Sequence, residues 1–600
     1  MQATPSPRHT YRMGLVGNCA YMAYIDDCAN VCWLCWPQFD SSFVFGSMLD
    51  DEQGGHFSIQ PEAQHYRTRQ YYQENTNILV TEFEEGENRF RVTDFAPRFP
   101  QYERYYKPLM LVRKVEPLAG RPQIKVQCRP VGDYGNLRPR VTKGSNHIRY
   151  LGLGEQMRLT TNIPLAYVSD ERSFVLNETK YLILTYGTPL EAPLEYTAED
   201  FLRKTSLHWR QWVQSSSIGN FYQEQLIRSA LALKIHQFED TGAIIASGST
   251  GLPEFPGSGR NWDYRYCWMR DSYYTLAAFH NIGHFEELES YFQYIENIIR
   301  NAGDHYQPLY AINGSSYIPE NEIPLKGYHG NQPVRIGNDA YTHIQNDVYG
   351  QVLVSLLPLY IDKRFTASLA RRSGYLIRDV LNRIAVTMDE PDAGLWEFRN
   401  RKQYHTYTYL FHWAGSNAAM QYAKALQDRD LYRKAQGLRA QSAAYLEKAR
   451  IPGTGVYGQA VDIPQMDAST LHIITMGYLK ADSRQAREHL AALERDLRVD
   501  GGLFYRYVHP DDFGAPESTF LICAYWYVEA LAVVGRLDEA IEVFDYLMQF
   551  GNHLGLLSED VSQKDGSQWG NFPQAYSHVG LMNAAFRIVR KLDRPDFLAD

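Results

Sequence analysis

The sequence lacks several features that would place the protein in other functional classes. It contains no uninterrupted run of about 18 apolar residues, the length that a membrane-spanning helix requires. The segment Met1–His9 has no apolar core of the kind found in secretory signals, so we expect a cytoplasmic protein. Basic residues form no long run and the net charge is −9, which argues against nucleic acid as a partner.

Cysteine is scarce, with seven residues in 600, and four of them fall between Cys19 and Cys35. The spacing of Cys32 and Cys35 would suit half of a zinc site. No second Cys or His pair nearby completes the four ligands of such a site, and the stretch from Cys32 to Trp36 is typical of an apolar strand. The sequence therefore predicts no metal site here.

The periodicity of apolar residues changes once along the chain. Roughly the first third alternates with period two, which predicts strands at 78–84, 89–95, 109–115, 124–128 and 174–185, the first two forming a hairpin. From about Phe201 the period becomes helical, for example over 222–238 and 518–534, and Gly535–Asp538 predicts a turn between two helices. Six hundred residues are more than a single hydrophobic core normally supports, so we expect two domains. The first is expected to be β-structure and the second a helical bundle or toroid.

Two carboxylates stand among glycines, prolines and aromatic residues, an unusual setting for acidic side chains. Glu397 lies between Trp396 and Phe398, and Glu559 precedes Asp560 in a segment that leads to Gly570–Gln574. A pocket that desolvates a carboxyl raises its pKa, as a general acid requires. The alternative is a pair of buried glutamates that arginines satisfy. Two such carboxylates across a sugar-sized cleft would suffice to hydrolyse a glycosidic bond.

The segment Gly257–Asp271 has four aromatic and five charged side chains in fifteen positions. Aromatic faces stack on pyranose rings, while Asp, Asn and Arg bind hydroxyls, so a sugar site uses both kinds of residue. The alternative is a helix start at which the aromatic residues join the core and Arg270 pairs with Asp271. The density of polar groups among the aromatic residues favours the sugar site.

These segments resemble family 15 of the glycoside hydrolases, the glucoamylase family, in order along the chain. The matching motifs are Trp33–Ser41, Arg260–Asp271, Pro333–Asn338, Asp347–Gly350, the Glu397 segment, His509–Gly514, and the Glu559 segment with Asn571–Gln574. The resemblance implies an antiparallel β-sandwich over residues 1–205, a linker to about 219, and an (α/α)6 barrel over 220–600. It implies no metal and no cofactor.

The resemblance also implies the catalytic roles. Glu397 matches the general acid and Glu559 the general base of an inverting hydrolase, with the two carboxyl groups about 6.5–9.5 Å apart. Asp560 is the alternative base, although the family motif places the base first in the acidic pair.

Six further residues match substrate-binding positions of the family. Arg270 and Asp271 correspond to the pair that binds the terminal glucose and makes cleavage exo. The others match the walls of the first subsite (Trp268 and Trp396), a tyrosine near the attacking water (Tyr264), and an arginine that binds sugar near the cleavage point (Arg335).

The sequence departs from the common bacterial pattern at Thr406–Tyr409, where relatives carry a Ser-Lys pair, and at Glu320–Tyr328, which is slightly shortened. Because of these two departures, the resemblance does not decide which α-glucoside is the substrate. An exo-hydrolase of α-glucans, releasing β-glucose as glucoamylases do, is the first hypothesis. An α,α-trehalase, or an enzyme for isomaltose or dextran, is the second. A non-catalytic relative is the third, and the presence of Glu397, Glu559, Arg270, Asp271 and Arg335 argues against it. The sequence does not indicate the oligomeric state.

Overall fold

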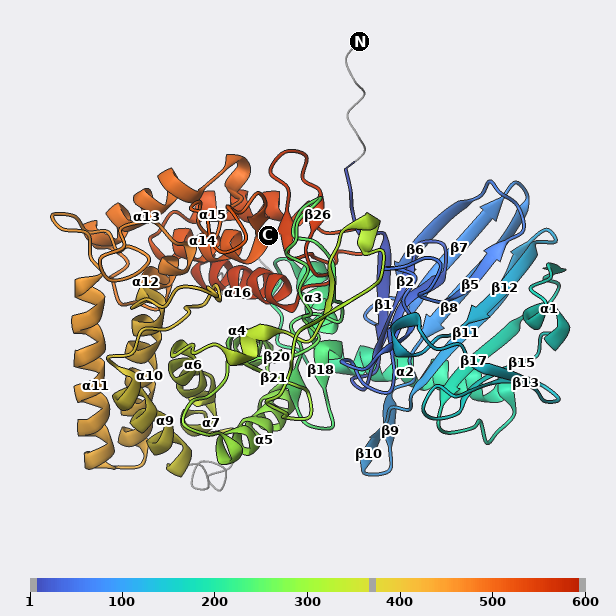
Figure 1. The fold of residues 1–600 in the computed structure, drawn as a ribbon, viewed down its shortest axis with the longest axis horizontal. Coiled ribbons are helices and arrows are strands. Elements are labelled where there is room, and N and C mark those ends of the chain that lie inside the picture. Colours follow the sequence, from blue (N-terminus) through green and yellow to red (C-terminus); the bar gives the residue numbers. More distant parts are fainter. Residues whose placement is uncertain (1–7, 366–373, 593–600) are drawn as a thin grey trace, which may run out of the picture.

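The computed structural model describes residues 8–365 and 374–592, in which a β-sheet part is followed by a helical part (Figure 1). The first sheet has the strand order β1-β2-β3-β5-β12-β16, with β4 paired to β3. The second has the order β13-β14-β15-β17-β11-β8-β7-β6. Neighbouring strands in both sheets are antiparallel, and side chains of both, such as Val31, Phe57 and Leu111, belong to one hydrophobic core. The amino-terminal part is therefore an antiparallel β-sandwich.

The strands of the first sheet are β1 (Met13–Gly17), β2 (Met22–Asp26), β3 (Asn30–Cys35), β4 (Phe43–Phe45), β5 (His56–Pro61), β12 (Gln123–Arg129) and β16 (Phe174–Val175). Those of the second are β6 (Arg67–Tyr72), β7 (Leu79–Glu85), β8 (Asn88–Phe95), β11 (Met110–Ala119), β13 (Arg140–Lys143), β14 (His147–Leu151), β15 (Met157–Thr161) and β17 (Lys180–Tyr186). A small hairpin, β9 (Phe99–Gln101) with β10 (Arg104–Tyr106), and helices α1 (Leu165–Ser169) and α2 (Leu194–Gln214) complete this part.

Most of the strand predictions are confirmed. The predicted hairpin is β7 and β8, in which Glu85 pairs with Asn88 across a turn at Gly86 and Glu87. The prediction of one strand over 174–185 is wrong, because β16 and β17 lie in different sheets. The polar residues Asn177–Thr179 separate them and carry the chain from one sheet to the other.

Twelve helices of the described residues form the (α/α)6 barrel as two concentric layers. The inner layer is α4 (Met269–Ile282), α6 (Asp347–Leu356), α10 (Thr406–Ala425), α12 (His472–Thr475), α14 (Leu521–Val533) and α16 (Ala575–Leu592). The outer layer is α3 (Gln223–His236), α5 (Phe285–Asn301), α9 (Gly374–Thr387), α11 (Arg429–Lys448), α13 (Arg484–Leu497) and α15 (Leu537–Met548).

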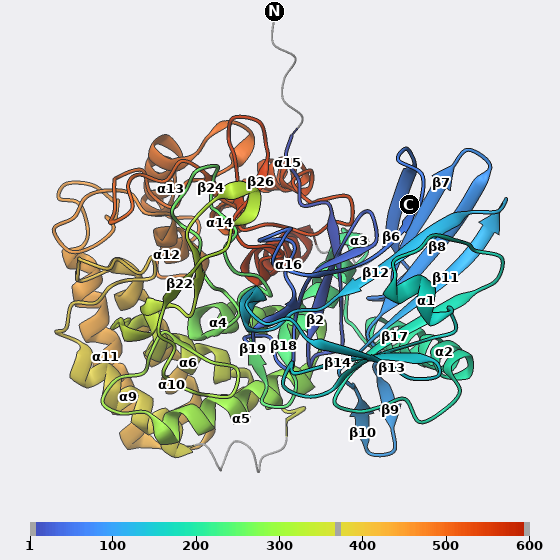
Figure 2. The ribbon, with the colours of Figure 1, turned by 45° about the vertical axis from the view of Figure 1, so that its right-hand side comes forward.

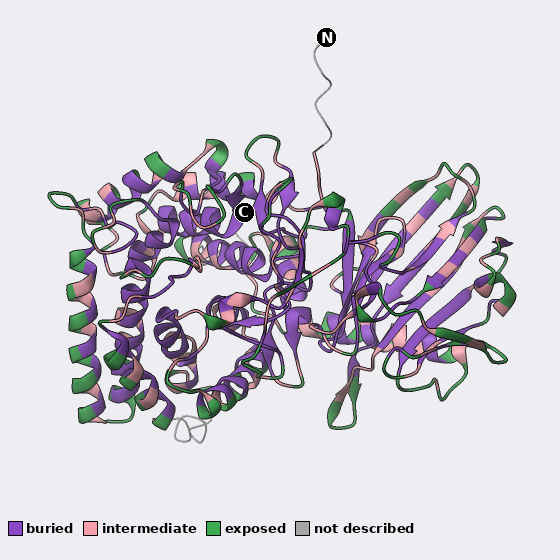
Figure 3. Ribbon diagram, viewed as in Figure 1, coloured by how far each residue is buried: buried purple, intermediate pink, exposed green. Residues whose placement is uncertain are grey.

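Burial separates the two layers, as Figure 3 shows. Residues Leu521–Ala532 of α14 are all buried, whereas α11 buries only a stripe of its residues. This difference is expected when one helix is enclosed and the other covers it. The predicted helices at 222–238 and 518–534 are α3 and α14, each a few residues shorter, and the predicted turn at Gly535 precedes α15. The first long helix, α2, begins at Leu194, seven residues before Phe201, where the sequence analysis placed the start of the helical pattern.

The sandwich lies against the barrel along α3 (Figure 2). The side-chain amide of Asn77 donates to the carbonyl of Leu231 on α3, and the indole of Trp33 donates to the carbonyl of Gly248. The predicted domain boundary near residues 205–219 stays a prediction. Of the helices in the described residues, none is both long and apolar enough to cross a membrane.

Short strands and helices fill the loops at the barrel ends. They are α7 (Pro358–Ile361), β18 (Gln237–Phe238), β19 (Ala243–Ile244), β20 (Cys267–Trp268), β21 (Leu309–Tyr310), β22 (Asn321–Ile323), β23 (Val334–Ile336), β24 (Thr519–Phe520), β25 (Asp560–Val561) and β26 (Gln568–Trp569).

Candidate active site

Loops that join barrel helices line a pocket that is partly open to solvent and holds about 840 Å³ of empty space, its open mouth included. Its walls combine charged and aromatic side chains. They include Glu254, Arg260, Trp262, Tyr264, Trp268, Arg270, Asp271, Trp396, Glu397, Arg399, Arg506, Asp511, Asp512, Phe513, Glu559 and Tyr576. Seven of the eight predicted site residues are among the lining residues, and Arg335 is not.

Glu397 lies in a tight turn that aims its side chain into the cavity. Its backbone has φ 61°, which is uncommon outside glycine and indicates a conformation imposed by the surroundings. Its Oε1 atom accepts hydrogen bonds from the indole of Trp268 at 2.7 Å and the amide of Gln345 at 3.3 Å, and the Arg270 guanidinium lies 3.4 Å away. The side chain is 24% exposed, so the carboxyl is fixed in orientation and still accessible.

Glu559 is buried where the chain enters the small sheet formed by β24, β25 and β26. Its Oε1 accepts a bond from the Tyr264 hydroxyl at 2.8 Å and its Oε2 a bond from the Asn571 backbone amide at 3.0 Å. Burial and the nearby negative charge of Glu254 raise the pKa of Glu559 above the usual range. A carboxylate with a raised pKa is a stronger base.

Asp560, the alternative base, does not line the cavity. Its Oδ1 accepts a bond from the Ser518 hydroxyl at 3.0 Å. The geometry favours Glu559.

A single short segment contacts both carboxylates. Tyr264 binds Glu559 and Trp268 binds Glu397, and the two rings meet edge to face with centroids 5.3 Å apart. This contact is one of the preferred arrangements of aromatic pairs. The two rings therefore fix the carboxylates relative to each other.

Arg270 and Asp271 lie in the first turn of α4, deep in the cavity. Arg270 donates to the Gln345 side-chain oxygen at 3.0 Å, whereas its Nε lies 3.6 Å from Asp271 Oδ1, too far for a hydrogen bond. Asp271 Oδ1 is buried without a hydrogen-bond partner, and burial raises the pKa of Asp271 to about 7. A buried carboxylate oxygen left unpaired is costly, and the hydroxyl of a bound ligand would satisfy it.

Trp396 and Arg335 differ in position. The indole of Trp396 donates to Asp467 at 2.8 Å, and its ring lies on the cavity wall near Phe520. Arg335 lies outside the cavity, 3.3 Å from Glu320 and over the ring of Trp262. Its contacts are those of a residue that supports the wall from behind.

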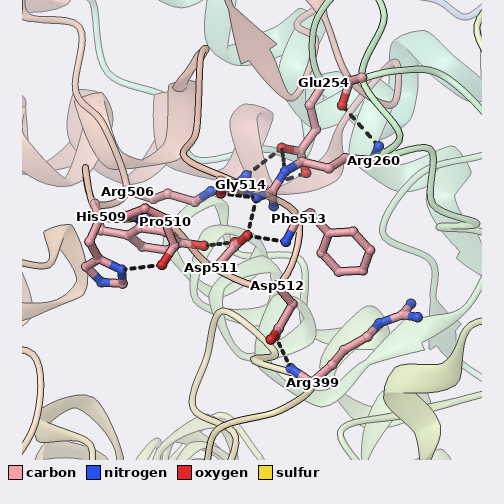
Figure 4. Close-up of polar contacts among 12 residues, drawn as sticks. Glu254, Arg260, Arg399, Arg506, His509, Pro510, Asp511, Asp512, Phe513 and Gly514 are labelled. Atoms are coloured by element: carbon pink, nitrogen blue, oxygen red, sulfur yellow. Dashed lines mark hydrogen bonds and ion pairs between the residues drawn. The ribbon is translucent and has the colours of Figure 1, made fainter.

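Several residues that the structure brings to the site were not among the predicted site residues, although Arg260 and Asp511 lie in motifs that the sequence analysis named. Arg506 forms an ion pair with Glu254, Arg260 forms one with Asp511, and all four side chains line the cavity (Figure 4). The signal for Arg506 was available, because it stands between Tyr505 and Tyr507 just before the His509–Gly514 motif. Gln345, which connects Arg270 with Glu397, had no such signal.

Within residues 8–365 and 374–592, no group of three or more His, Cys, Asp or Glu side chains is arranged to hold a metal ion. Cys32 and Cys35 are buried side chains of β3.

A two-domain fold with paired carboxylates in an aromatic-lined barrel cavity defines a glycoside hydrolase. The sequence model of the glycosyl hydrolases family 15 matches residues 220–586, and that of the trehalase-like N-terminal domain matches residues 3–170. The chain therefore belongs to glycoside hydrolase family 15.

Two similar proteins are trehalases of archaea. The trehalase of Thermoplasma volcanium is 32% identical and the alignment covers 96% of this chain and 93% of that protein. The trehalase of Thermoplasma acidophilum is also 32% identical, with 92% and 96% covered. A bacterial glucoamylase solved with acarbose has the same fold, with a TM-score of 0.70 over 99% of this chain and 97% of that one, at 15% identity. The chain is thus an α-glucoside hydrolase.

Proposed function

We propose that the protein is an α,α-trehalase that hydrolyses its substrate with inversion of configuration. The relatives named trehalase are similar over nearly their whole length, including the amino-terminal domain, whereas the likeness to glucoamylase is one of fold. This similarity reverses the order of the first two hypotheses from the sequence.

The observation that carries the proposal is the pair of carboxylates in one cavity, each bound by one ring of the Tyr264–Trp268 pair. Glu397, partly exposed and beside Arg270, acts as the general acid. Glu559, buried and with a raised pKa, acts as the general base.

In the reaction, Glu397 donates its proton to the glycosidic oxygen as the bond from that oxygen to the anomeric carbon breaks. Glu559 takes a proton from a water molecule, whose oxygen forms the new bond on the opposite face of the ring. The products are two glucose molecules, one with inverted β configuration and one that keeps its α configuration. Both carboxyl groups then exchange protons with water to restore the starting state.

The deep end of the cavity is suited to the glucose that is attacked. Asp271 Oδ1 lacks a hydrogen bond in the described structure and accepts from sugar hydroxyls in this proposal. Arg270 lies beside it, and Trp268 and Trp396 supply the aromatic walls on which the ring packs. A closed end of this kind makes cleavage exo.

The decisive experiment measures glucose release from trehalose, maltose, isomaltose, maltoheptaose and starch. We expect trehalose to have the highest kcat/KM. Proton NMR of the first products from trehalose should show α- and β-glucose in equal amounts. Preference for maltoheptaose or starch would contradict the trehalase assignment, and α-glucose alone would contradict inversion.

A further inference from the structure

The loop His509–Gly514, here called the 509–514 loop, lies between Arg260 and Arg399, and its polar contacts with both are drawn in Figure 4. Three of its residues, Asp511, Asp512 and Phe513, line the cavity. It follows Arg506 and precedes β24. The proposed mechanism does not use it.

On one side the loop is bound to the segment that carries the proposed acid. The Asp512 carboxylate accepts from the backbone amide of Arg399 at 2.7 Å and from the side-chain amide of Asn400 at 2.9 Å. The Arg401 guanidinium donates to the carbonyl of Pro510 at 2.8 Å. These contacts lie two to four residues beyond Glu397.

On the other side the loop is bound to the segment before Tyr264. Arg260 forms an ion pair with Asp511 and donates to the carbonyl of Gly514 at 2.9 Å. The rings of Phe513 and Trp262 meet edge to face with centroids 5.0 Å apart. The loop therefore spans from the Glu397 wall to the Trp262 wall.

Exposure indicates where the loop lies along the path of a bound sugar. Asp271 and Trp268 at the deep end are 6% and 2% exposed, whereas Phe513 is 38% exposed. The side chain of Glu397 is intermediate, at 24%. When the attacked glucose occupies the deep end, its leaving group extends past Glu397 towards the loop.

The inner side of the loop presents the contacts that a pyranose needs. Asp511, Asp512, Phe513, Trp262 and Arg399 line the cavity here. Carboxylates, guanidinium groups and aromatic rings are the groups that bind the hydroxyls and the faces of a pyranose. The two hydrogen bonds of Asp512 join the loop to the segment Arg399–Asn400, and we infer that this connection blocks the space into which a third sugar unit would extend.

We propose that the 509–514 loop forms the subsite for the leaving glucose and, through the Asp512 contacts, restricts the enzyme to substrates of two sugar units. This inference rests on the proposed catalytic roles and deepens them by assigning the determinant of chain length. Asp512 is a specificity-determining residue in this proposal.

The test compares Asp512→Ala and Phe513→Ala with the parent on trehalose and on a set of maltooligosaccharides from maltose to maltoheptaose. For both variants we expect kcat/KM on the preferred disaccharide to fall by about 10- to 100-fold, the effect of losing charge-assisted or packing contacts. For Asp512→Ala the ratio of trisaccharide to disaccharide activity should rise. Inhibition by free glucose, which occupies the deep end, should stay within about twofold.

The matched control is Asp496→Ala, which removes an exposed aspartate paired only with its neighbour Arg495. It should behave as the parent in every assay. Disaccharide activity of Asp512→Ala and Phe513→Ala within twofold of the parent would overturn the proposal. Equal losses on all chain lengths, together with weaker glucose inhibition, would also overturn it, because they would show that the loop only supports the acid segment.

The parent measured alone separates this inference from the proposed function. If the parent does not cleave trehalose, the trehalase assignment fails, and the loop proposal is judged on the disaccharide that it does cleave and on the same sugar extended at its reducing end. Should Asp512→Ala fail to fold, Asp512→Asn, which keeps one acceptor, and Phe513→Ala decide the result.

Discussion

Glu254 is buried in the cavity wall, where it forms an ion pair with Arg506. Its negative charge, after burial itself, is the main cause of the raised pKa of Glu559. A base must be ionised to act, so kcat/KM falls as pH falls through this raised pKa. The acid limb of the profile should therefore lie above the usual glutamate range near ~4.3.

Replacing Glu254 with Gln removes the like charge, so the pKa of Glu559 should fall and the acid limb should move to lower pH. Measuring kcat/KM from pH 3 to 9 checks this shift. Glu529→Gln is the control, since Glu529 is also buried but lies at the other end of the barrel, near Arg587. If the acid limb of the kcat/KM profile does not move in Glu254→Gln, Glu559 is not the base whose titration produces that limb.

The two catalytic assignments are tested directly by Glu397→Gln and Glu559→Gln. Each should lower kcat by about 10²–10⁴-fold, the usual contribution of a general acid or base, with little change in melting temperature. Asp560→Asn discriminates the bases and should keep more activity than Glu559→Gln. Activity near the parent's for either glutamine variant would refute that residue's role.

Asp271→Asn should lower kcat more than it raises KM. Its unpaired Oδ1 is suited to a sugar hydroxyl, and a charge-assisted hydrogen bond contributes about 1.5–3 kcal/mol, of which the part made only in the transition state appears in kcat. Kinetics and melting temperature are measured together. A destabilised variant with unchanged kcat would instead indicate a structural ion pair with Arg270.

At this scale the sequence predicts residues that belong to short motifs. Tyr264, Trp268, Arg270 and Asp271 fall within eight positions, so one segment revealed all four. Arg506 and Glu254 meet across 252 residues, and Gln345 has a function only through its contacts with Arg270 and Glu397. Such long-range pairs depend on how loops converge, which local spacing does not encode.

Among the elements, α6 and α10 pack closely where two glycines meet. A Cβ atom at Gly350 would lie 2.0 Å from the carbonyl oxygen of Phe411, and one at Gly415 would lie 2.7 Å from the Cα of Gly350. A separation of the two helices would displace the start of α6. Asp347 is the first residue of α6, and Gln345, two residues earlier, binds Arg270.

Gly350→Ala should therefore destabilise the protein, by about 1–3 kcal/mol as for an overpacked core. Gly437→Ala is the matched control, because Gly437 lies in the exposed face of α11 with nothing within 4 Å of an added Cβ. This variant should stabilise by up to about 1 kcal/mol, the helix preference for alanine over glycine. Thermal unfolding of both variants measures whether Gly350→Ala lowers and Gly437→Ala raises the stability. Equal changes in stability would contradict the packing argument.

The sequence predicted helices and strands correctly where apolar residues recur with a clear period over a long segment. The β7–β8 hairpin and helix α14 are examples, although α14 starts at Leu521 because Thr519 and Phe520 pair as β24 with the strand after Glu559. The 174–185 segment was misassigned because the predicted strand ran through Asn177–Thr179, where the chain passes from one sheet to the other. Which sheet a strand joins is a tertiary property.

Across the whole molecule, Arg265 connects the sandwich to the catalytic segment. It is fully buried, pairs with Asp263 at 2.7 Å, and donates to the carbonyl of Ser41 in the sandwich at 2.7 Å. It directly follows Tyr264, which binds Glu559. The sandwich therefore helps to fix the position of the proposed base.

Arg265→Met should lower the unfolding free energy by about 3–5 kcal/mol, since it leaves Asp263 charged and unpaired in the interior. It should also lower kcat through Tyr264. Arg12→Met, which breaks an exposed pair with Asp27, should cost less than about 1 kcal/mol. Calorimetry and kinetics on both variants test this, and equal stability losses would show that burial does not decide the cost.

The Arg265 contacts have a consequence for how such enzymes can be recombined. A barrel excised at a linker near residue 219 would lose the Ser41 carbonyl and the Tyr134 hydroxyl that Arg265 reaches, and would keep a buried guanidinium with fewer acceptors. Exchange of amino-terminal domains between family members should succeed only when the loop around Ser41 is inherited with the barrel. The Arg265 contacts therefore tie the evolution of the loop around Ser41 to that of the catalytic segment, although the two lie in different parts of the chain.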